Sequence, residues 1–169
     1  MHSCLVGSEM CIRDRDTETS SLNPQEAELI GISVSYAPNK SFYIPVGHKK
    51  NKCLSKDLVI KKMKPILEDP SIKKVGQNIK YDYIIFKKSG VELNSIEDTM
   101  LLSYTLDAGN NRHNMDTLSE LHLGHKTISY KDLVGTGKKQ LKFSEVDLDK
   151  ATEYAAEDAV SYTHLRAHE

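Results

Sequence analysis

Short runs of β-branched and aromatic residues in the first part of the sequence predict strands. Residues 28–36 (ELIGISVSY) and 41–46 (SFYIPV) are two such runs, and the turn-forming residues 37–40 (APNK) separate them. This arrangement predicts a β-hairpin, because a short turn between two strand-forming runs allows antiparallel pairing. Residues 73–77 (KKVGQ) predict one further short strand.

Apolar residues at helical spacing dominate the later part of the sequence. Ser55 is a suitable N-cap for a helix that is expected to end before Pro70. The apolar positions of that helix are Leu58, Val59, Met63, Ile66 and Leu67. Further helices are predicted over residues 80–89, 99–106, 115–123 and 147–159. Strands that come first and helices that dominate later predict an α/β fold, with a mixed sheet covered by helices.

The DNA sequences that encode the two ends of the chain form an inverted repeat. Residues 5–14 (LVGSEMCIRD) and 160–169 (VSYTHLRAHE) match codon by codon as products of opposite strands. The implied DNA resembles the end sequence of transposon-based library adapters. Residues 1–15 and 160–169 are therefore expected to be adapter-derived and are excluded from the fold prediction. The domain itself is expected to span residues 16–159 and to lack most of its first strand.

The composition limits the classes of protein to which the chain can belong. Its 169 residues suit one domain, and no apolar run approaches the roughly 18 residues that a membrane span needs, so a soluble protein is expected. The net charge of −1 gives no bulk attraction to nucleic acid, so DNA contacts would depend on local basic patches or metal ions. Outside the flanks Cys53 is the one cysteine, which excludes an internal disulfide framework and fits a reducing cytoplasm.

Five polar residues have spacings that suggest a shared site. Asp16 and Glu18 are expected at the end of a strand before the hairpin, where alternate residues point to one face. Tyr154 and Asp158 are four residues apart in a predicted helix and therefore share a face of it. Asp82 opens a helix directly after a strand, and loops at strand ends are common places for functional sites.

Three segments resemble the motifs of the DEDDy 3′→5′ exonuclease family: DTETSSL at 16–22, GQNIKYD at 76–82 and YAAED at 154–158. The segments EDTMLLSYTLDAG, RHNMDTLSE and KTISYKDLVGTGKKQLKF are similar to the proofreading exonuclease domains of bacterial DNA polymerase I. The resemblance covers essentially all of residues 16–159. It implies a ribonuclease H-like fold, a five-stranded mixed sheet with helices on both faces, and a polymerase domain in the same polypeptide.

The resemblance also implies a two-metal mechanism. Asp16, Glu18 and Asp158 would hold the first cation, and Asp16 would also reach a second cation held by Asp82. Tyr154 and Glu18 would orient the water that attacks the terminal phosphate, and the product would be a nucleoside 5′-monophosphate. Carboxylate oxygens suit Mg²⁺ or Mn²⁺ rather than Zn²⁺. Four acids around one site need such cations, since each like-charged pair costs roughly 4 kcal/mol at about 4 Å and an effective dielectric constant near 20.

Four other residues resemble substrate-binding residues of the family. Leu22 and Tyr130 would pack against the 3′-terminal base, and Asn78 and Arg112 would contact the strand near the cut. The alternatives are a core position for Leu22, an ordinary surface position for Tyr130 and a structural salt bridge for Arg112. The implied partner is a single-stranded or frayed 3′ end of DNA, and the implied protein is a monomer in the bacterial cytoplasm.

Two alternative functions share some of these features. A ribonuclease D-like exoribonuclease would have the same motifs and metals, but the stretch at residues 126–143 argues against it. A catalytically inert strand-binding module belongs to another class, and the presence of all four acids argues against that. His113, His122 and His125 suggest a ligand cluster, but oxygen-ligand chemistry needs none, so they are interpreted as surface or core residues.

Overall fold

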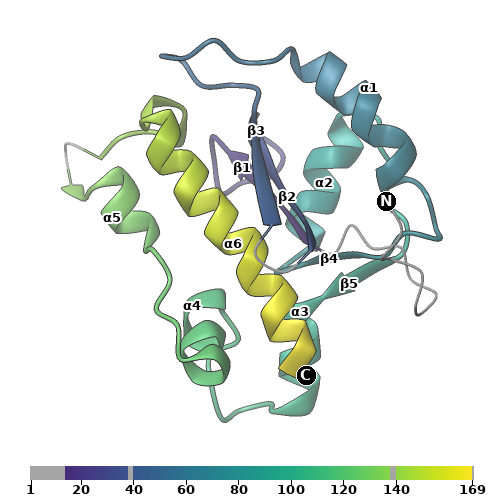
Figure 1. Cartoon of the computed structure of the whole chain (residues 1–169), viewed down its shortest axis with the longest axis vertical. Helices are drawn as coiled ribbons and strands as arrows, with labels where there is room; N and C mark the ends of the chain where they lie inside the picture. The colour runs from purple at the N-terminus through teal and green to yellow at the C-terminus, as the bar shows by residue number, and fades with distance from the viewer. Residues whose placement is uncertain (1–13, 38–39, 138–139, 169) are drawn as a thin grey trace.

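The centre of the fold is a five-stranded mixed sheet. The computed structural model describes residues 14–37, 40–137 and 140–168. The strands are β1 (Asp14–Thr19), β2 (Leu29–Ala37), β3 (Lys40–Pro45), β4 (Lys74–Gly76) and β5 (Ile96–Asp98), in the order β3-β2-β1-β4-β5 across the sheet. β2 is antiparallel to β1 and β3, whereas β4 is parallel to β1 and β5 (Figure 1). The predicted five-stranded mixed sheet is confirmed.

The predicted hairpin corresponds to β2 and β3. Ile32 pairs with Ile44, and the next residue along β2, Ser33, pairs with Tyr43. Because successive residues of a strand point to opposite faces, the first pair faces one layer of helices and the second pair faces the other. Residues 38–39 of the predicted turn lie outside the described residues.

Helices cover both faces of the sheet. They are α1 (Lys56–Leu67), α2 (Lys80–Lys88), α3 (Thr99–Leu106), α4 (Met115–Leu118), the π-helical turn η1 (Ser119–Leu123), α5 (Tyr130–Val134), the 3₁₀ turn η3 (Phe143–Glu145) and α6 (Leu148–His168). α1 and α2 lie on one side of the strands, and α5 and α6 lie on the other (Figure 1). Ile32 and Phe86 belong to the core under α1 and α2, whereas Ile30 and Ala151 belong to the core under α6.

Most of the predicted helices are present. Those predicted over residues 80–89 and 99–106 correspond to α2 and α3. The helix predicted over residues 115–123 is divided, because α4 is followed by the π-helical turn, which ends before Gly124 at a φ of 61°. Glycine adopts this left-handed conformation without steric cost, so the chain can leave the helix there. Ser55 is the N-cap of α1 as predicted, but its side chain makes no capping hydrogen bond.

Three short elements were not predicted. β5, α5 and η3 have three, five and three residues, which is too short for a periodic pattern to be visible in the sequence. The helix predicted over residues 147–159 is α6, which begins at Leu148 and continues to His168, through the flank expected to be adapter-derived. Every helix in the described part of the chain is too short or too polar to cross a membrane.

Candidate active site

Three of the predicted acids converge between β1 and α6. Asp16 pairs with Ser33, and Glu18 pairs with Gly31, so the two acids project toward the same face of the sheet. α6 packs against that face and contributes Asp158. Asp16, Glu18 and Asp158 each offer a carboxylate oxygen, and these oxygens lie within 4.8 Å of one another.

The three carboxylates are crowded, and two of them are largely removed from water. Glu18 is 8% exposed and Asp158 is 7% exposed. Burial raises the pKa of Glu18 and of Asp158 well above the usual range, and the nearby charge of Asp16 raises both further. A divalent cation would remove this repulsion, and an all-oxygen ligand set suits Mg²⁺ or Mn²⁺. The residues present therefore fit such an ion.

The fourth acid, Asp82, has a different local environment. It lies in the first turn of α2, is buried, and accepts a hydrogen bond from the hydroxyl of Thr17. Burial raises the pKa of Asp82 to about 7, the charge of Asp16 adds to this rise, and Arg15 and Thr17 oppose it. Asp82 lines the same cavity as Asp16 and Glu18, but it does not belong to the group of three converging oxygens.

Tyr154 lies one helical turn before Asp158 on α6. Its hydroxyl forms a hydrogen bond with that carboxyl group. Burial raises the pKa of Tyr154, and the charges of Asp158 and Glu18 raise it further, so the hydroxyl keeps its proton. The centre of its ring lies 6.3 Å from the ring centres of both Tyr130 and Phe143. These contacts fix a hydrogen-bond donor beside the acids.

A cavity of about 680 Å³ opens beside the acids. Its walls are β1 and the residues after it, the start of α2, and the side chains of Tyr130, Gln140 and Tyr154. Leu22 lines the cavity and is 97% exposed, so the alternative that Leu22 is a core residue is wrong. Tyr130 is 44% exposed, and its ring is parallel to that of Phe143 at a centroid distance of 6.5 Å. Both side chains are accessible from the cavity.

Asn78 and Arg112 were predicted to contact the DNA strand, and of these two Asn78 lies at the cavity. Asn78 lines it in a left-handed conformation, with a φ of 55°. The carboxylate of Asp98 accepts hydrogen bonds at 3.0 Å from the backbone N–H groups of Asn78 and Ile79, and it also caps α3 at Met100. Asp98 thus holds the strained turn in place. Arg112 is exposed and is not among the residues that line the cavity.

Other polar residues that build the cavity were missed by the sequence prediction. The hydroxyl of Tyr81 lies 2.6 Å from that of Thr19 and also donates to the carbonyl of Ser21, so it joins α2 to the segment after β1. The side-chain amide of Gln77 donates to the carbonyl of His113 at 2.6 Å. Gln77 and Tyr81 both belong to the GQNIKYD segment, and this was the available signal.

Arg15 fits its surroundings poorly. Its side chain is 1% exposed, and its guanidinium carbon lies 5.1 Å from the centre of the Phe86 ring. Within the described structure the three guanidinium nitrogens have no hydrogen-bond partner. Burial lowers the pKa of Arg15 to about 10, although Asp82 and Asp16 oppose this. A buried charge without hydrogen bonds is costly, and this is also a residue that we expect to be adapter-derived.

The histidines make local contacts away from the acids. Nδ1 of His113 lies 2.9 Å from the hydroxyl of Ser103, and Nε2 of His125 lies 2.8 Å from a carboxylate oxygen of Glu157. His122 is exposed. Within the described part of the chain, none of the three belongs to a group of converging metal-ligand atoms. This agrees with their interpretation as surface or core residues.

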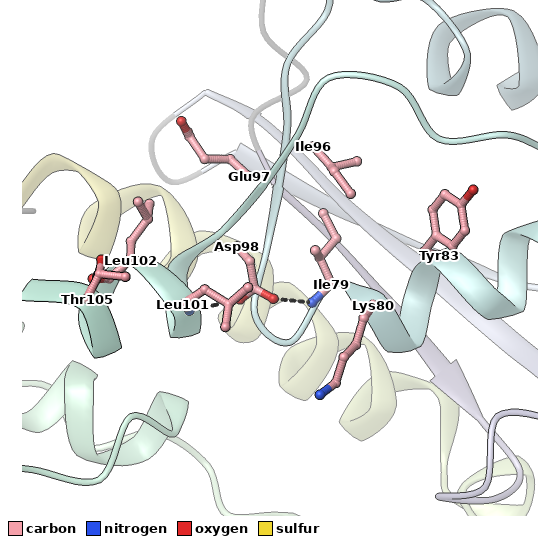
Figure 2. A pocket seen from close by; sticks show the side chains of 9 residues that line it. All are labelled: Ile79, Lys80, Tyr83, Ile96, Glu97, Asp98, Leu101, Leu102 and Thr105. Atoms are coloured by element: carbon pink, nitrogen blue, oxygen red, sulfur yellow. Dashed lines mark hydrogen bonds between the residues drawn. The ribbon is translucent and has the colours of Figure 1, made fainter. Parts of the chain in front are cut away.

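A second cavity, of about 530 Å³, lies between β5, α2 and α3 and is mostly apolar (Figure 2). Its two acids have local partners. The carboxylate of Asp98 accepts from the N–H of Ile79 at 3.0 Å, as Figure 2 shows, and Glu97 pairs with Lys73 at 3.4 Å. Within the described residues, neither acid belongs to a group of converging metal-ligand atoms.

Comparison with known proteins relates the chain to nucleases. A family model described as 3′-5′ exonuclease matches residues 15–168. DNA polymerase I of Rhizobium leguminosarum is 45% identical over 165 residues, which cover 85% of this chain and 16% of that protein. DNA polymerase I of Pseudomonas aeruginosa is 41% identical over 150 residues, with the same shares of 85% and 16%. The chain therefore spans about 16% of the length of these relatives.

Solved structures of other nucleases have the same fold. Trypanosoma brucei RNase D superposes with a TM-score of 0.73 at 19% identity, over 95% of this chain and 57% of that chain. Brucella melitensis NrnC superposes with a TM-score of 0.71 at 21% identity, over 95% of this chain and 73% of that chain. The ribonuclease H-like fold is thus confirmed. The match over residues 15–168, taken with the curated relatives, shows that this chain belongs to the 3′-5′ exonuclease domain family of bacterial DNA polymerase I.

Proposed function

We propose that the chain removes nucleoside 5′-monophosphates from the 3′ end of DNA, as the proofreading exonuclease of a DNA polymerase I. The observation that carries this proposal is the convergence of Asp16, Glu18 and Asp158 within 4.8 Å, in a chain that belongs to an exonuclease family. Residues 16–159 would form the domain, flanked by adapter-derived residues. The polymerase domain would belong to the same polypeptide, and the protein would be a monomer in the bacterial cytoplasm.

The acids would hold two Mg²⁺ or Mn²⁺ ions. Asp16, Glu18 and Asp158 would hold one ion, and Asp82, with Asp16, would hold the other. When bound, the ions would supply an activated water and stabilise negative charge on the phosphate. The crowding that raises the pKa of Glu18 and Asp158 supports this, because a group of acids that repel one another gains from binding a cation.

The side chains around the acids would position the substrate. The protonated hydroxyl of Tyr154 would donate a hydrogen bond to the attacking water. The carboxylate of Glu18 would accept a hydrogen bond from the same water. Leu22 and Tyr130 are exposed apolar and aromatic surfaces at the cavity, suited to packing on the 3′-terminal base. Asn78, held by Asp98, would contact the strand near the cut.

The direct test is digestion of a 5′-labelled single-stranded DNA by this chain. We expect the label to remain on products that shorten one nucleotide at a time from the 3′ end. Activity should require Mg²⁺ or Mn²⁺ and disappear in excess EDTA and in the Asp158→Ala variant. Cleavage that continues in EDTA, or internal cutting, would contradict the proposal.

A second candidate is an exoribonuclease, because RNase D of Trypanosoma brucei has the same fold. DNA and RNA oligonucleotides of the same sequence, present together and labelled differently, would separate the two functions. Faster loss of RNA would favour the exoribonuclease. Binding of either strand without cleavage, with metal present, would instead indicate an inert strand-binding module.

A further inference from the structure

Tyr43 reaches across the sheet toward Glu18. Tyr43 on β3 pairs with Ser33 on β2, which pairs with Asp16 on β1, so the three residues share the face that carries the acids. A Cβ atom on Gly31 would overlap the hydroxyl oxygen of Tyr43. The Tyr43 hydroxyl therefore occupies the space above Gly31. Gly31 is the residue of β2 that pairs with Glu18, so the hydroxyl lies next to that acid.

The electrostatics agree with this proximity. Burial raises the pKa of Tyr43, and the charge of Glu18 is the next largest cause of the rise. The hydroxyl therefore keeps its proton and can donate it. Glu18 is buried, and its Oε1 has no hydrogen-bond partner in the described structure. A buried carboxylate oxygen needs a donor, and Tyr43 is a donor on the same face.

His48 holds Tyr43 in place. Its Nε2 lies 2.7 Å from the hydroxyl oxygen of Tyr43, and the two rings meet edge to face at a centroid distance of 5.7 Å. His48 is 6% exposed, and its ring also contacts that of Phe143 at 5.8 Å. Burial lowers the pKa of His48, so the ring is neutral near pH 7. An ionised Glu18 can only accept hydrogen bonds, so a Tyr43 hydroxyl that serves Glu18 would donate to it and would itself accept from the N–H of His48.

We infer that Tyr43 and His48 are a positioning pair that orients the Glu18 carboxylate for binding of the catalytic cation and for holding the attacking water. The inference rests on the proposed function. Neither residue would contact the substrate, and His48 would act only through Tyr43. Groups that support metal ligands in this way commonly contribute about 10- to 100-fold to metal affinity or activity.

The test uses the Tyr43→Phe variant of this chain, with Tyr36→Phe as the matched control. Tyr36 lies on β2, is 48% exposed and stacks on Phe42, away from the acids. Calorimetry with Mn²⁺, thermal unfolding without metal and single-turnover cleavage would be measured for each variant. We expect Tyr43→Phe to lose about 10-fold in Mn²⁺ affinity or turnover, with a thermal midpoint close to that of the parent chain. The control should match the parent in all three measurements.

His48 is tested by a double-mutant cycle. His48→Ala should weaken Mn²⁺ binding in the parent chain but should add little to the defect of Tyr43→Phe, and His48→Gln should restore part of the affinity. Parental Mn²⁺ affinity and turnover in Tyr43→Phe would overturn the inference, as would equal losses in the Tyr36→Phe control. A parent chain that neither binds Mn²⁺ nor cleaves DNA would instead overturn the proposed function, and the inference with it.

Discussion

The guanidinium carbon of Arg15 lies 5.1 Å from the centre of the Phe86 ring, in the layer between β1 and α2. Apart from Thr17 and Asp82, this layer is mostly apolar, and the three guanidinium nitrogens have no hydrogen-bond partner in the described structure. The burial of this cation and the raised pKa values of the buried acids both affect the stability of the chain.

Replacing Arg15 with leucine should stabilise the chain. Near pH 5, where Asp82 is protonated and needs no positive partner, removing a buried charge that lacks hydrogen bonds should raise the free energy of unfolding by about 1 to 3 kcal/mol. Urea denaturation would measure this. The matched control is Arg112→Leu, since Arg112 is exposed and its replacement should change stability by less than about 0.5 kcal/mol. Lower stability of the Arg15→Leu variant would show that the cation has a stabilising role.

Without metal, the stability of the chain should fall as the pH rises from 5 to 7, by about 1.4 kcal/mol per pH unit for each group concerned. The pKa of Asp82 is about 7 in the folded chain, against an ordinary value of 3.8. Between these values the folded chain keeps a proton that the unfolded chain has lost, so a higher pH favours unfolding. Glu18 and Asp158 act in the same direction.

Urea denaturation in EDTA at several pH values would measure this slope, and a stability that rises over the range would contradict the assignment. Asp82→Asn should make the slope shallower. Glu153→Gln, which changes an exposed acid on the same helix as Asp158, should leave it unchanged. Saturating Mg²⁺ should flatten the slope, because a bound cation keeps the acids ionised.

Asp158→Ala and Tyr154→Phe should separate metal binding from turnover. Asp158→Ala removes one of the converging carboxylates, so metal affinity and cleavage should both be nearly lost, while stability without metal should rise as repulsion is relieved. Tyr154→Phe removes only a hydroxyl, so metal binding should persist while turnover falls by about 10² to 10³. Calorimetry and single-turnover rates would decide, and near-normal metal affinity in Asp158→Ala would require a different site.

Tyr130→Ala should weaken substrate binding more than it slows chemistry. Stacking of a base on an aromatic ring contributes about 1 to 3 kcal/mol, so KM should rise by roughly 5- to 150-fold with kcat little changed. Tyr104→Ala is the control, since Tyr104 is another exposed tyrosine, at 57%, and is not among the residues that line the cavity. An unchanged KM for Tyr130→Ala would mean that its ring serves only to contact Phe143.

Local patterns in the sequence specify which acids face the same way. Asp16 and Glu18 alternate on a strand, and Tyr154 and Asp158 are one turn apart on a helix, so each pair shares a face whatever the rest of the chain does. The hairpin and the longer helices were predictable for the same reason, since local periodicity specifies them. The likeness of three motifs to one nuclease family then indicated that these faces meet.

The partners of the side chains depend on how distant segments of the chain pack. The hydroxyl of Thr17 donates a hydrogen bond to the carboxylate of Asp82. The two residues are 65 positions apart, so no local pattern connects them. The same holds for β5, whose three residues form a strand because β4 lies beside them. The contact between Tyr43 and Gly31 arises from strand register, and the burial of Arg15 arises from the packing of α2 on β1. Periodicity specifies the direction of a side chain, but the group that it meets depends on how distant segments pack.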